Sequence, residues 1–182
     1  MPRIPAITGK ADVPAAHHGV VDAVVKVFGG VRGPFSMLLH SPPLAERLLP
    51  LVTFFRDEST VAGPLRSVAI LAAVREREAA YVWSAQVGQA RRNGVAEAII
   101  DVLRAKGDPA GLPAAEREIV VYVRQLMRTN KVDQAAFDAL ARRHGARWMV
   151  EMTAVASYFA MLCGVVNAFE VAAPPDGDKL PA

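Results

Sequence analysis

The stretch from residue 64 to residue 94, PLRSVAILAAVREREAAYVWSAQVGQARRNG, constrains the fold more than any other part of the chain. Its apolar spacing predicts two consecutive amphipathic helices joined by a short charged turn from Arg75 to Glu78. Two such helices must bury their apolar faces against further elements of the same type. We therefore expect the rest of the chain to pack around a central helical hairpin.

Within this hairpin, Ser67 and Gln86 are predicted to lie at the same level. They are about equally far from the turn, and an α-helix rises by about 1.5 Å per residue, so antiparallel arms bring them side by side. Trp83 precedes Gln86 by three positions and therefore shares its helix face. We expect Ser67, Gln86 and Trp83 to contribute to one substrate pocket.

The remainder of the chain also predicts helices, because no segment alternates apolar and polar residues as a strand does and the β-branched residues fall within helical periods. Asp133 is a predicted N-cap, and Ser41 followed by Pro42 predicts a helix start. The expected helices cover residues 15–28, 34–39, 42–57, 95–105, 113–128, 134–143 and 146–168. The fold class is therefore all-α, with about seven to eight helices around the core hairpin.

A chain of 182 residues with 52% hydrophobic content is long enough for one domain. We expect a flexible N-terminal arm over residues 1–14, a helical domain over residues 15–172 and a flexible C-terminal tail over residues 173–182. The apolar content exceeds what an average monomer needs, which favours a homo-oligomer.

Composition argues against several classes of function. The 21 Lys and Arg residues are scattered and nearly balanced by 18 Asp and Glu, a pattern that does not indicate nucleic-acid binding. The single cysteine, Cys163, rules out an intramolecular disulfide and CxxC redox chemistry, and the dispersed histidines indicate no metal site. The first residues lack the apolar run of a secretory signal, so a cytoplasmic location is expected.

The segment from Met152 to Phe169 carries no charge over about 18 residues, which is close to the shortest membrane span. It contains several polar residues, and glutamates flank it on both sides. A core helix, partly at a subunit interface, is the favoured interpretation, and membrane insertion is the alternative.

This last helix and its surroundings offer candidate polar chemistry. Glu151 and Tyr158 lie seven residues apart on one stripe, where burial would raise the carboxyl pKa and allow either group to protonate a ligand. The alternative is a structural pair of Glu151 with a neighbouring arginine and a packed Tyr158. Arg66 is a candidate for binding a substrate carboxylate or for a structural ion pair, and His40 for pocket access or simple packing.

Several segments in the expected order resemble the carboxymuconolactone decarboxylase family, which shares its fold with alkylhydroperoxidase D. They are LRSVAIL, YVWSAQ followed by ARRNGV, and EMTAVASYFAMLCGVVNAF, with PFSMLLHSPPLAERL upstream. The resemblance spans about residues 30 to 172. It implies an all-α domain, a homo-oligomer (dimer, trimer or hexamer) and a small-molecule pocket beside the hairpin without a cofactor.

The functional positions of that family are not retained here. In its peroxidases the resemblance places a glutamate at Ser67, cysteines at Ala79 and Val82, and a histidine at Gln86. Without thiolates the peroxidase route has no nucleophile. Tyr81 and Trp83 match the YxW pattern of the non-redox members, but Gln86 cannot shuttle a proton as their histidine does.

The leading hypothesis is a cofactor-free decarboxylase or lyase that acts on a small carboxylated or lactone-type molecule. In this scheme Arg66 anchors the substrate, Ser67 and Gln86 hold an enolate oxygen, and Tyr158 or Glu151 supplies the proton. A non-catalytic oligomeric binding protein is the second hypothesis. An oxidative-stress protein that depends on Cys163 is the third, by analogy of fold alone.

Overall fold

The computed structural model describes residues 2–181, and within them every regular element is a helix. Short 3-10 turns lie at residues 10–12, 15–17 and 109–111. The eight described α-helices are α1 (His18–Phe28), α2 (Pro34–Leu38), α3 (Pro42–Asp57), α4 (Gly63–Glu76), α5 (Ala80–Arg92), α6 (Glu97–Arg104), α7 (Ala114–Thr129) and α8 (Gln134–Ala168). The predicted all-α fold is therefore confirmed.

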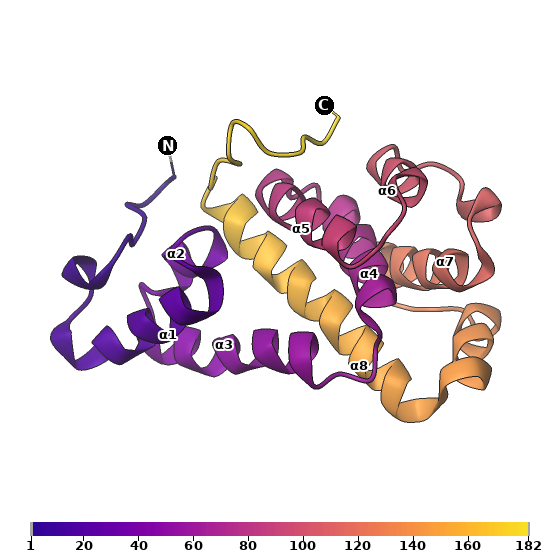
Figure 1. Cartoon of the computed structure of the whole chain (residues 1–182), viewed down its shortest axis with the longest axis horizontal. Coiled ribbons are helices and arrows are strands. Elements are labelled where there is room, and N and C mark those ends of the chain that lie inside the picture. The colour runs from indigo at the N-terminus through magenta and orange to yellow at the C-terminus, as the bar shows by residue number, and fades with distance from the viewer. Residues whose placement is uncertain (1, 182) are drawn as a thin grey trace.

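Helix α4 forms the centre of the molecule and packs against α5, α6, α7 and α8 (Figure 1). Every residue from Ser67 to Arg75 is buried, so this helix is surrounded on all sides. The predicted hairpin with α5 is present, but the expectation that both arms are amphipathic is wrong for α4. A helix that is apolar around its whole circumference belongs in the interior of a bundle.

Helix α8 runs diagonally between the hairpin on one side and the N-terminal helices on the other (Figure 1). Gly145 interrupts it with φ 77° and ψ 174°, a left-handed conformation that favours glycine, at the position where the sequence predicts one helix to end and the next to begin. Asp133 caps its start by accepting a hydrogen bond from the Ala136 N–H at 2.7 Å. Ser41 makes no such cap at the start of α3, where Pro42 occupies the first helical position.

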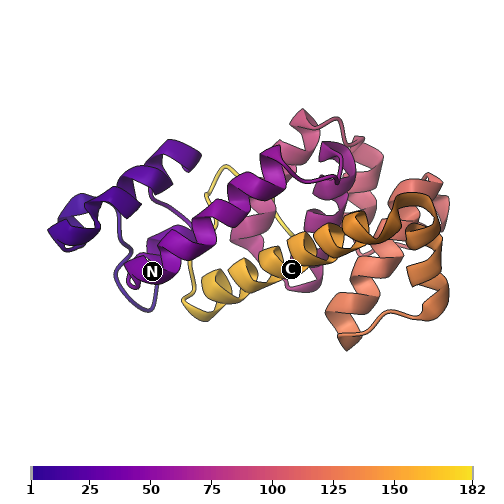
Figure 2. The same cartoon turned by 90° about the horizontal axis from the view of Figure 1, so that it is seen from below.

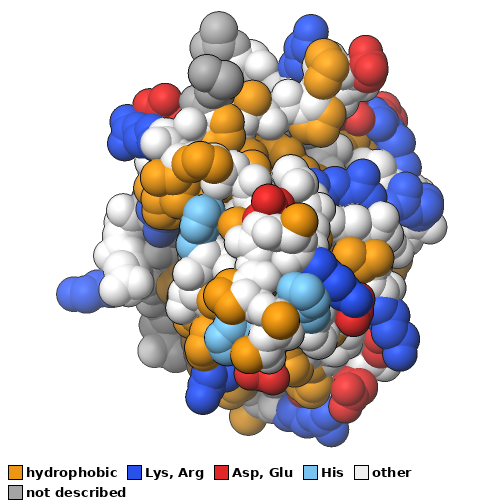
Figure 3. Space-filling view, turned by 90° about the vertical axis from the view of Figure 1, so that its left-hand side faces the viewer, with side chains coloured by type: hydrophobic (Ala, Val, Ile, Leu, Met, Phe, Trp, Pro, Cys, Tyr) orange, Lys and Arg blue, Asp and Glu red, His pale blue; other side chains and the backbone are white. Residues whose placement is uncertain are grey.

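Helices α1, α2 and α3 form a separate layer, with α3 beside α8 (Figure 2). The N-terminal arm covers this layer and contributes Ile7 and Val13 to the core. At this end of the molecule, apolar side chains lie in small clusters between charged ones and histidines (Figure 3). Leu44 and Leu51 belong to the apolar stripe of the α3 sequence, but they are 46% and 40% exposed.

Helix α8 is long and apolar enough to cross a membrane by length and composition alone. However, 56% of its most apolar window is buried inside the fold. This burial is typical of the core helix of a helical bundle, and it agrees with the favoured interpretation of the segment Met152 to Phe169.

Candidate functional site

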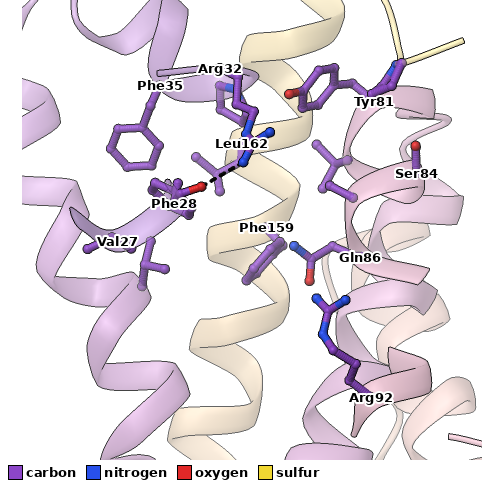
Figure 4. A pocket seen from close by; sticks show the side chains of 15 residues that line it. Val27, Phe28, Arg32, Phe35, Tyr81, Ser84, Gln86, Arg92, Phe159 and Leu162 are labelled. Carbon is purple, nitrogen blue, oxygen red and sulfur yellow. Dashed lines mark hydrogen bonds between the residues drawn. The ribbon is translucent and has the colours of Figure 1, made fainter. Parts of the chain in front are cut away.

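A cavity lies where α1, α2 and α3 meet α5 and α8 (Figure 4). Its volume is about 490 Å³, which is enough for a small organic molecule. The lining residues are Val27, Phe28, Arg32, Pro34, Phe35, Val52, Tyr81, Val82, Ser84, Ala85, Gln86, Arg92, Phe159, Leu162 and Pro174. Helix α5 supplies more of them than any other element.

One wall of the pocket is apolar and aromatic. The rings of Phe28 and Phe35 pack against each other with centroids 5.1 Å apart, and Phe159 and Leu162 of α8 lie opposite α5 (Figure 4). Phe35, Phe159 and Leu162 are almost completely buried, so their positions are fixed by the core. Such a wall favours a flat apolar ligand because aromatic faces bury a large area and stack on one another.

The polar groups of the pocket keep hydrogen-bonding capacity for a ligand. Between the residues drawn in Figure 4 the single hydrogen bond is the one that the Arg32 side chain donates to the Phe28 backbone carbonyl at 2.8 Å. Arg92 donates to the Gln89 amide oxygen at 2.8 Å. Within residues 2–181, neither guanidinium forms an ion pair with a carboxylate. The pocket therefore offers two cations without counter-ions to an anionic ligand.

Tyr81 stands at the end of the pocket near Arg32 (Figure 4). Its ring packs against Gly33, where an added Cβ would lie 2.3 Å from the ring carbon Cε1. Tyr81 is the one tyrosine whose hydroxyl has no hydrogen-bond partner within the described chain, because Tyr122 bonds to Thr153 and Tyr158 bonds to a carbonyl. Burial raises the pKa of Tyr81 and the charge of Arg32 partly offsets this effect, so the phenol stays protonated at neutral pH.

No carboxylate, histidine or cysteine is present among the described residues that line the pocket. Its titratable groups are Tyr81, Arg32 and Arg92. The site can therefore bind and polarise an anion and donate a proton, but it contains no general base for neutral pH and no thiol nucleophile.

Of the residues predicted for the pocket, the structure places Gln86 in its lining and Ser67 and Trp83 elsewhere. The Ser67 hydroxyl accepts a hydrogen bond from Asn93 at 2.8 Å and is buried. Trp83 is fully buried, with the Arg104 guanidinium 5.9 Å from the centre of its ring. The prediction that Ser67, Gln86 and Trp83 share one pocket is therefore wrong, because Ser67 and Trp83 face the core.

Glu151 forms a separate, saturated cluster. Its carboxylate accepts hydrogen bonds from Ser59 Oγ at 2.9 Å, from Thr60 N and Oγ1 at 2.6 and 2.8 Å, and from Arg147 Nε at 2.8 Å. Burial alone would raise the pKa of Glu151, but these bonds outweigh it and lower the pKa to about 2. The predicted rise in its pKa is wrong, and the alternative of a structural pair with a neighbouring arginine is correct.

The other predicted polar residues also lie outside the lining of the pocket. The Tyr158 hydroxyl donates to the Leu48 carbonyl at 3.1 Å, and burial raises the pKa of Tyr158. Arg66 donates to the Val61 carbonyl at 3.0 Å, so within the described residues it makes a structural hydrogen bond and not the ion pair of the alternative. His40 binds the Pro5 carbonyl at 2.8 Å and so holds the N-terminal arm.

The positions that hold cysteines in the resembling peroxidases are closed to solvent. Ala79 is 0% exposed and Val82 is 3% exposed, although Val82 contributes a methyl surface to the pocket. Cys163 is buried on α8, outside the lining, and burial raises the pKa of its thiol to about 12. It is therefore not placed or ionised as a peroxidatic thiol.

Sequence reasoning missed Arg32, Ser84, Arg92 and Phe159, and it noted Tyr81 without assigning it to the site. The spacing of residues on α5 could have indicated two of these residues, Tyr81 and Arg92. Tyr81, Ala85 and Arg92 are spaced by four and seven residues, so they form one stripe on α5. Arg32 and Phe159 come from distant segments, and no local pattern connects them to this stripe.

No family model and no curated protein matches the sequence. Solved structures do match the fold. A peroxidase-related protein from Ralstonia eutropha JMP134, described as an alkylhydroperoxidase AhpD core, has a TM-score of 0.78 at 17% identity and covers 96% of this chain and 93% of its own. A variant of the debrominase Bmp8 in complex with 2,3,4-tribromopyrrole has a TM-score of 0.75 at 17% identity and covers 96% and 95%.

A protein of unknown function from Agrobacterium tumefaciens has a TM-score of 0.68 at 14% identity, covering 80% of this chain and all of its own. These similarities show that the chain has the alkylhydroperoxidase D-like fold. They agree with the resemblance of its segments to the carboxymuconolactone decarboxylase family. At such low identity they do not transfer an activity.

Proposed function

We propose that the chain is a cofactor-free lyase that binds a small carboxylated or lactone-type molecule in this pocket and removes carbon dioxide from it. The observation that carries the proposal is the pair of guanidiniums, Arg32 and Arg92, without carboxylate partners at the edge of an aromatic cavity. A cation left without a counter-ion beside an apolar wall is suited to an anion with a ring-shaped body.

Decarboxylation fits the groups that are present. The reaction needs no base, since the ionised substrate carboxylate leaves as carbon dioxide and its bonding electrons pass to an adjacent carbonyl as an enolate. Arg92 and Gln86 lie near each other and would stabilise the enolate oxygen (Figure 4). Tyr81 then donates its proton to carbon and regains one from water.

The apolar wall has its own part in this scheme. A charged carboxylate is poorly solvated against Phe28, Phe35 and Phe159. Neutral carbon dioxide does not have this cost. Desolvation at this wall therefore favours loss of carbon dioxide, provided that the cations hold the carbonyl oxygen and not the leaving carboxylate. Substrates with an acid and a carbonyl or lactone group on one small ring meet this requirement.

The first test is ligand binding. Aromatic and lactone carboxylic acids are screened by thermal shift, and the affinities of hits are measured by calorimetry for native protein and for Arg92→Gln. Loss of a charged hydrogen bond should weaken binding by about tenfold or more. The matched control is Arg142→Gln, since Arg142 is exposed on the N-terminal part of α8, and it should bind as the native protein does. Equal affinities of Arg92→Gln and native protein would contradict the proposal that the acid binds in this pocket.

The second test is turnover of the bound acid. Release of carbon dioxide is measured for native protein and for Tyr81→Phe, and loss of the proton donor should lower kcat by about a hundredfold or more with little change in KM. The 2,3,4-tribromopyrrole bound by the Bmp8 variant is also a small ring, and its carboxylated analogues are reasonable members of the screen.

A non-catalytic binding protein is the second candidate. The observation in its favour is that the described lining contains no carboxylate, histidine or cysteine. It predicts a saturable ligand that is recovered unchanged after long incubation, with Tyr81→Phe altering affinity alone.

We also propose self-association through the exposed face of α8. Val150 is 67% exposed and Phe137 is 42% exposed, and both line a shallow apolar groove. Light scattering should report an oligomer for the native protein and a smaller species for Val150→Glu, which places a charge in that groove.

A further inference from the structure

The C-terminal segment, residues 171–181, follows α8 and turns back toward α5 (Figure 1). One side of this irregular segment packs against the helical domain. Val171 and Leu180 pack against the hydrophobic core, and Gly177 and Asp178 are half-buried. Asp176 directly precedes them and is exposed, so burial distinguishes two nearby aspartates of the same segment.

This segment forms part of the pocket. Pro174 is one of the lining residues, and the Gly177 N–H donates to the Pro174 carbonyl at 3.1 Å in a tight turn. Gly177 lies directly against Ser84, another lining residue: an added Cβ would be 1.8 Å from Ser84 Oγ and 2.9 Å from Ser84 Cβ. The segment therefore closes over the α5 side of the cavity with no room for a side chain between them.

Ion pairs hold the segment against the helical domain. Asp178 accepts hydrogen bonds from Arg91 Nη1 at 2.7 Å and Nη2 at 3.1 Å, and Arg104 Nη2 lies 3.5 Å from the same carboxylate. Glu97 holds Arg91 in place through two further bonds of 2.9 and 2.8 Å. The Arg91 and Asp178 side chains remain 42% and 26% exposed, and ion pairs with this exposure are weak.

We propose that residues 171–181 are the movable wall of the ligand site, which opens to admit an organic anion and closes with Pro174 beside it. This inference rests on the proposed function of the pocket. The contacts that hold the segment are partly exposed ion pairs and a few apolar contacts. Segments held in this way open more readily than the packed helices.

The position of Asp178 makes a specific kinetic prediction. Its ion pairs with Arg91 and Arg104 hold the closed segment, and Asp178 itself is not a lining residue. The proposal has the same ion pairs in the closed state with and without ligand. Removing its charge therefore makes opening easier in both states. Association and dissociation should accelerate together, and the equilibrium affinity should change little.

The probe for this test is 8-anilinonaphthalene-1-sulfonate, an aromatic anion whose fluorescence rises in an apolar site. Stopped-flow measurements on full-length protein compare native, Asp178→Asn and the matched control Asp176→Asn. We expect Asp178→Asn to raise both rate constants about fivefold with less than a twofold change in Kd. Asp176→Asn should behave as the native protein does. Raising the salt concentration should speed the native protein and affect Asp178→Asn less, because salt screens the same ion pairs.

A second variant and a second readout complete the test. Gly177→Ala inserts a methyl group against Ser84 and should displace the segment, so hydrogen exchange of a peptide covering residues 171–181 should be faster in Gly177→Ala and Asp178→Asn than in Asp176→Asn. The proposal of a movable wall is contradicted if Arg92→Gln weakens probe binding but neither segment variant changes the association rate. If Arg92→Gln leaves probe affinity unchanged, the proposed function fails and this inference fails with it.

Discussion

Two polar regions of the molecule both contain guanidiniums and hydroxyl groups, but these groups have a carboxylate partner in one region and none in the other. Around Glu151, a carboxylate, a guanidinium and two hydroxyl residues are hydrogen-bonded to one another. In the pocket, Arg32, Arg92 and Tyr81 face an aromatic cavity, and no carboxylate completes the set. The first arrangement stabilises a loop against α8, and the second is left for a ligand.

The comparison shows that burial of a polar residue on a core helix does not by itself indicate function. Burial and hydrogen bonding act against each other at Glu151, and hydrogen bonding is stronger, so the carboxylate stays ionised. Unpaired hydrogen-bonding capacity in a concave site is the more informative signal. The predictions below test each half of this contrast.

The largest effect is expected for Glu151→Gln. The variant leaves the half-buried Ser59, the exposed Thr60 and the Arg147 guanidinium without their charged acceptor, which should lower the free energy of unfolding by about 3 kcal/mol. Urea denaturation followed by circular dichroism measures the change. Glu46→Gln, at an exposed position of α3, should shift it by less than about 0.5 kcal/mol. A shift as small as that of Glu46→Gln would show that the cluster contributes little.

The same carboxylate predicts a pH dependence. The folded-state pKa of about 2 lies below the ordinary value of 4.5, so the stabilisation is complete above pH 4.5 and is lost as the pH falls toward 2. The difference in unfolding free energy between native protein and Glu151→Gln should therefore be constant from neutral pH to about 4.5 and shrink below it. A difference that does not change with pH would contradict the assigned ionisation.

Gly33→Ala should affect both stability and the pocket. Gly33 has φ 58° and ψ −136°, a combination that is essentially restricted to glycine, and its added methyl would meet the Tyr81 ring. We expect a loss of about 2 kcal/mol in unfolding free energy and weaker binding of pocket ligands. Gly30→Ala is the control, because a Cβ at Gly30 meets nothing within 4 Å. If the two variants bind ligand equally well, the position of Tyr81 does not matter to the site.

The sequence predicted the helical elements well because their signals are local. The α3 bounds at Pro42 and Asp57 and the break at Gly145 follow from proline placement, apolar periodicity and a left-handed glycine. The exposure of Leu44 and the burial of every α4 residue from Ser67 to Arg75 could not be predicted in the same way. They depend on which other helices reach a given face, and periodicity within one helix does not contain that information.

The candidate site was predicted less well for the same reason. Gln86 lines the cavity, yet the level that it shares with Ser67 on adjacent helices does not make both side chains point into that cavity. Tyr158 was attractive as an acid because its stripe is buried, but the Leu48 carbonyl from a distant helix satisfies its hydroxyl. Long-range partners of this kind decide which polar groups remain available.

The smallest expected effect comes from returning a titratable group to the pocket with Gln86→His. The resembling family has histidine at this position, and here the side chain faces the cavity near Arg92 (Figure 4). Burial and the nearby cation should lower the pKa of the new histidine below its usual value of about 6.5. Below that pKa the imidazolium adds a third positive charge, so an aromatic sulfonate should bind about threefold more tightly at pH 5.5 than at pH 8.

The native protein should bind the same probe with nearly constant affinity over this range, since the described lining contains no group that titrates there. Gln134→His places the same residue at the start of α8, outside the lining, and serves as the control. Fluorescence titration at the two pH values separates the three proteins. A pH-independent affinity in Gln86→His would show that the bound anion does not reach this end of the pocket, whereas the expected rise would locate the anion beside the position where the family has its proton carrier.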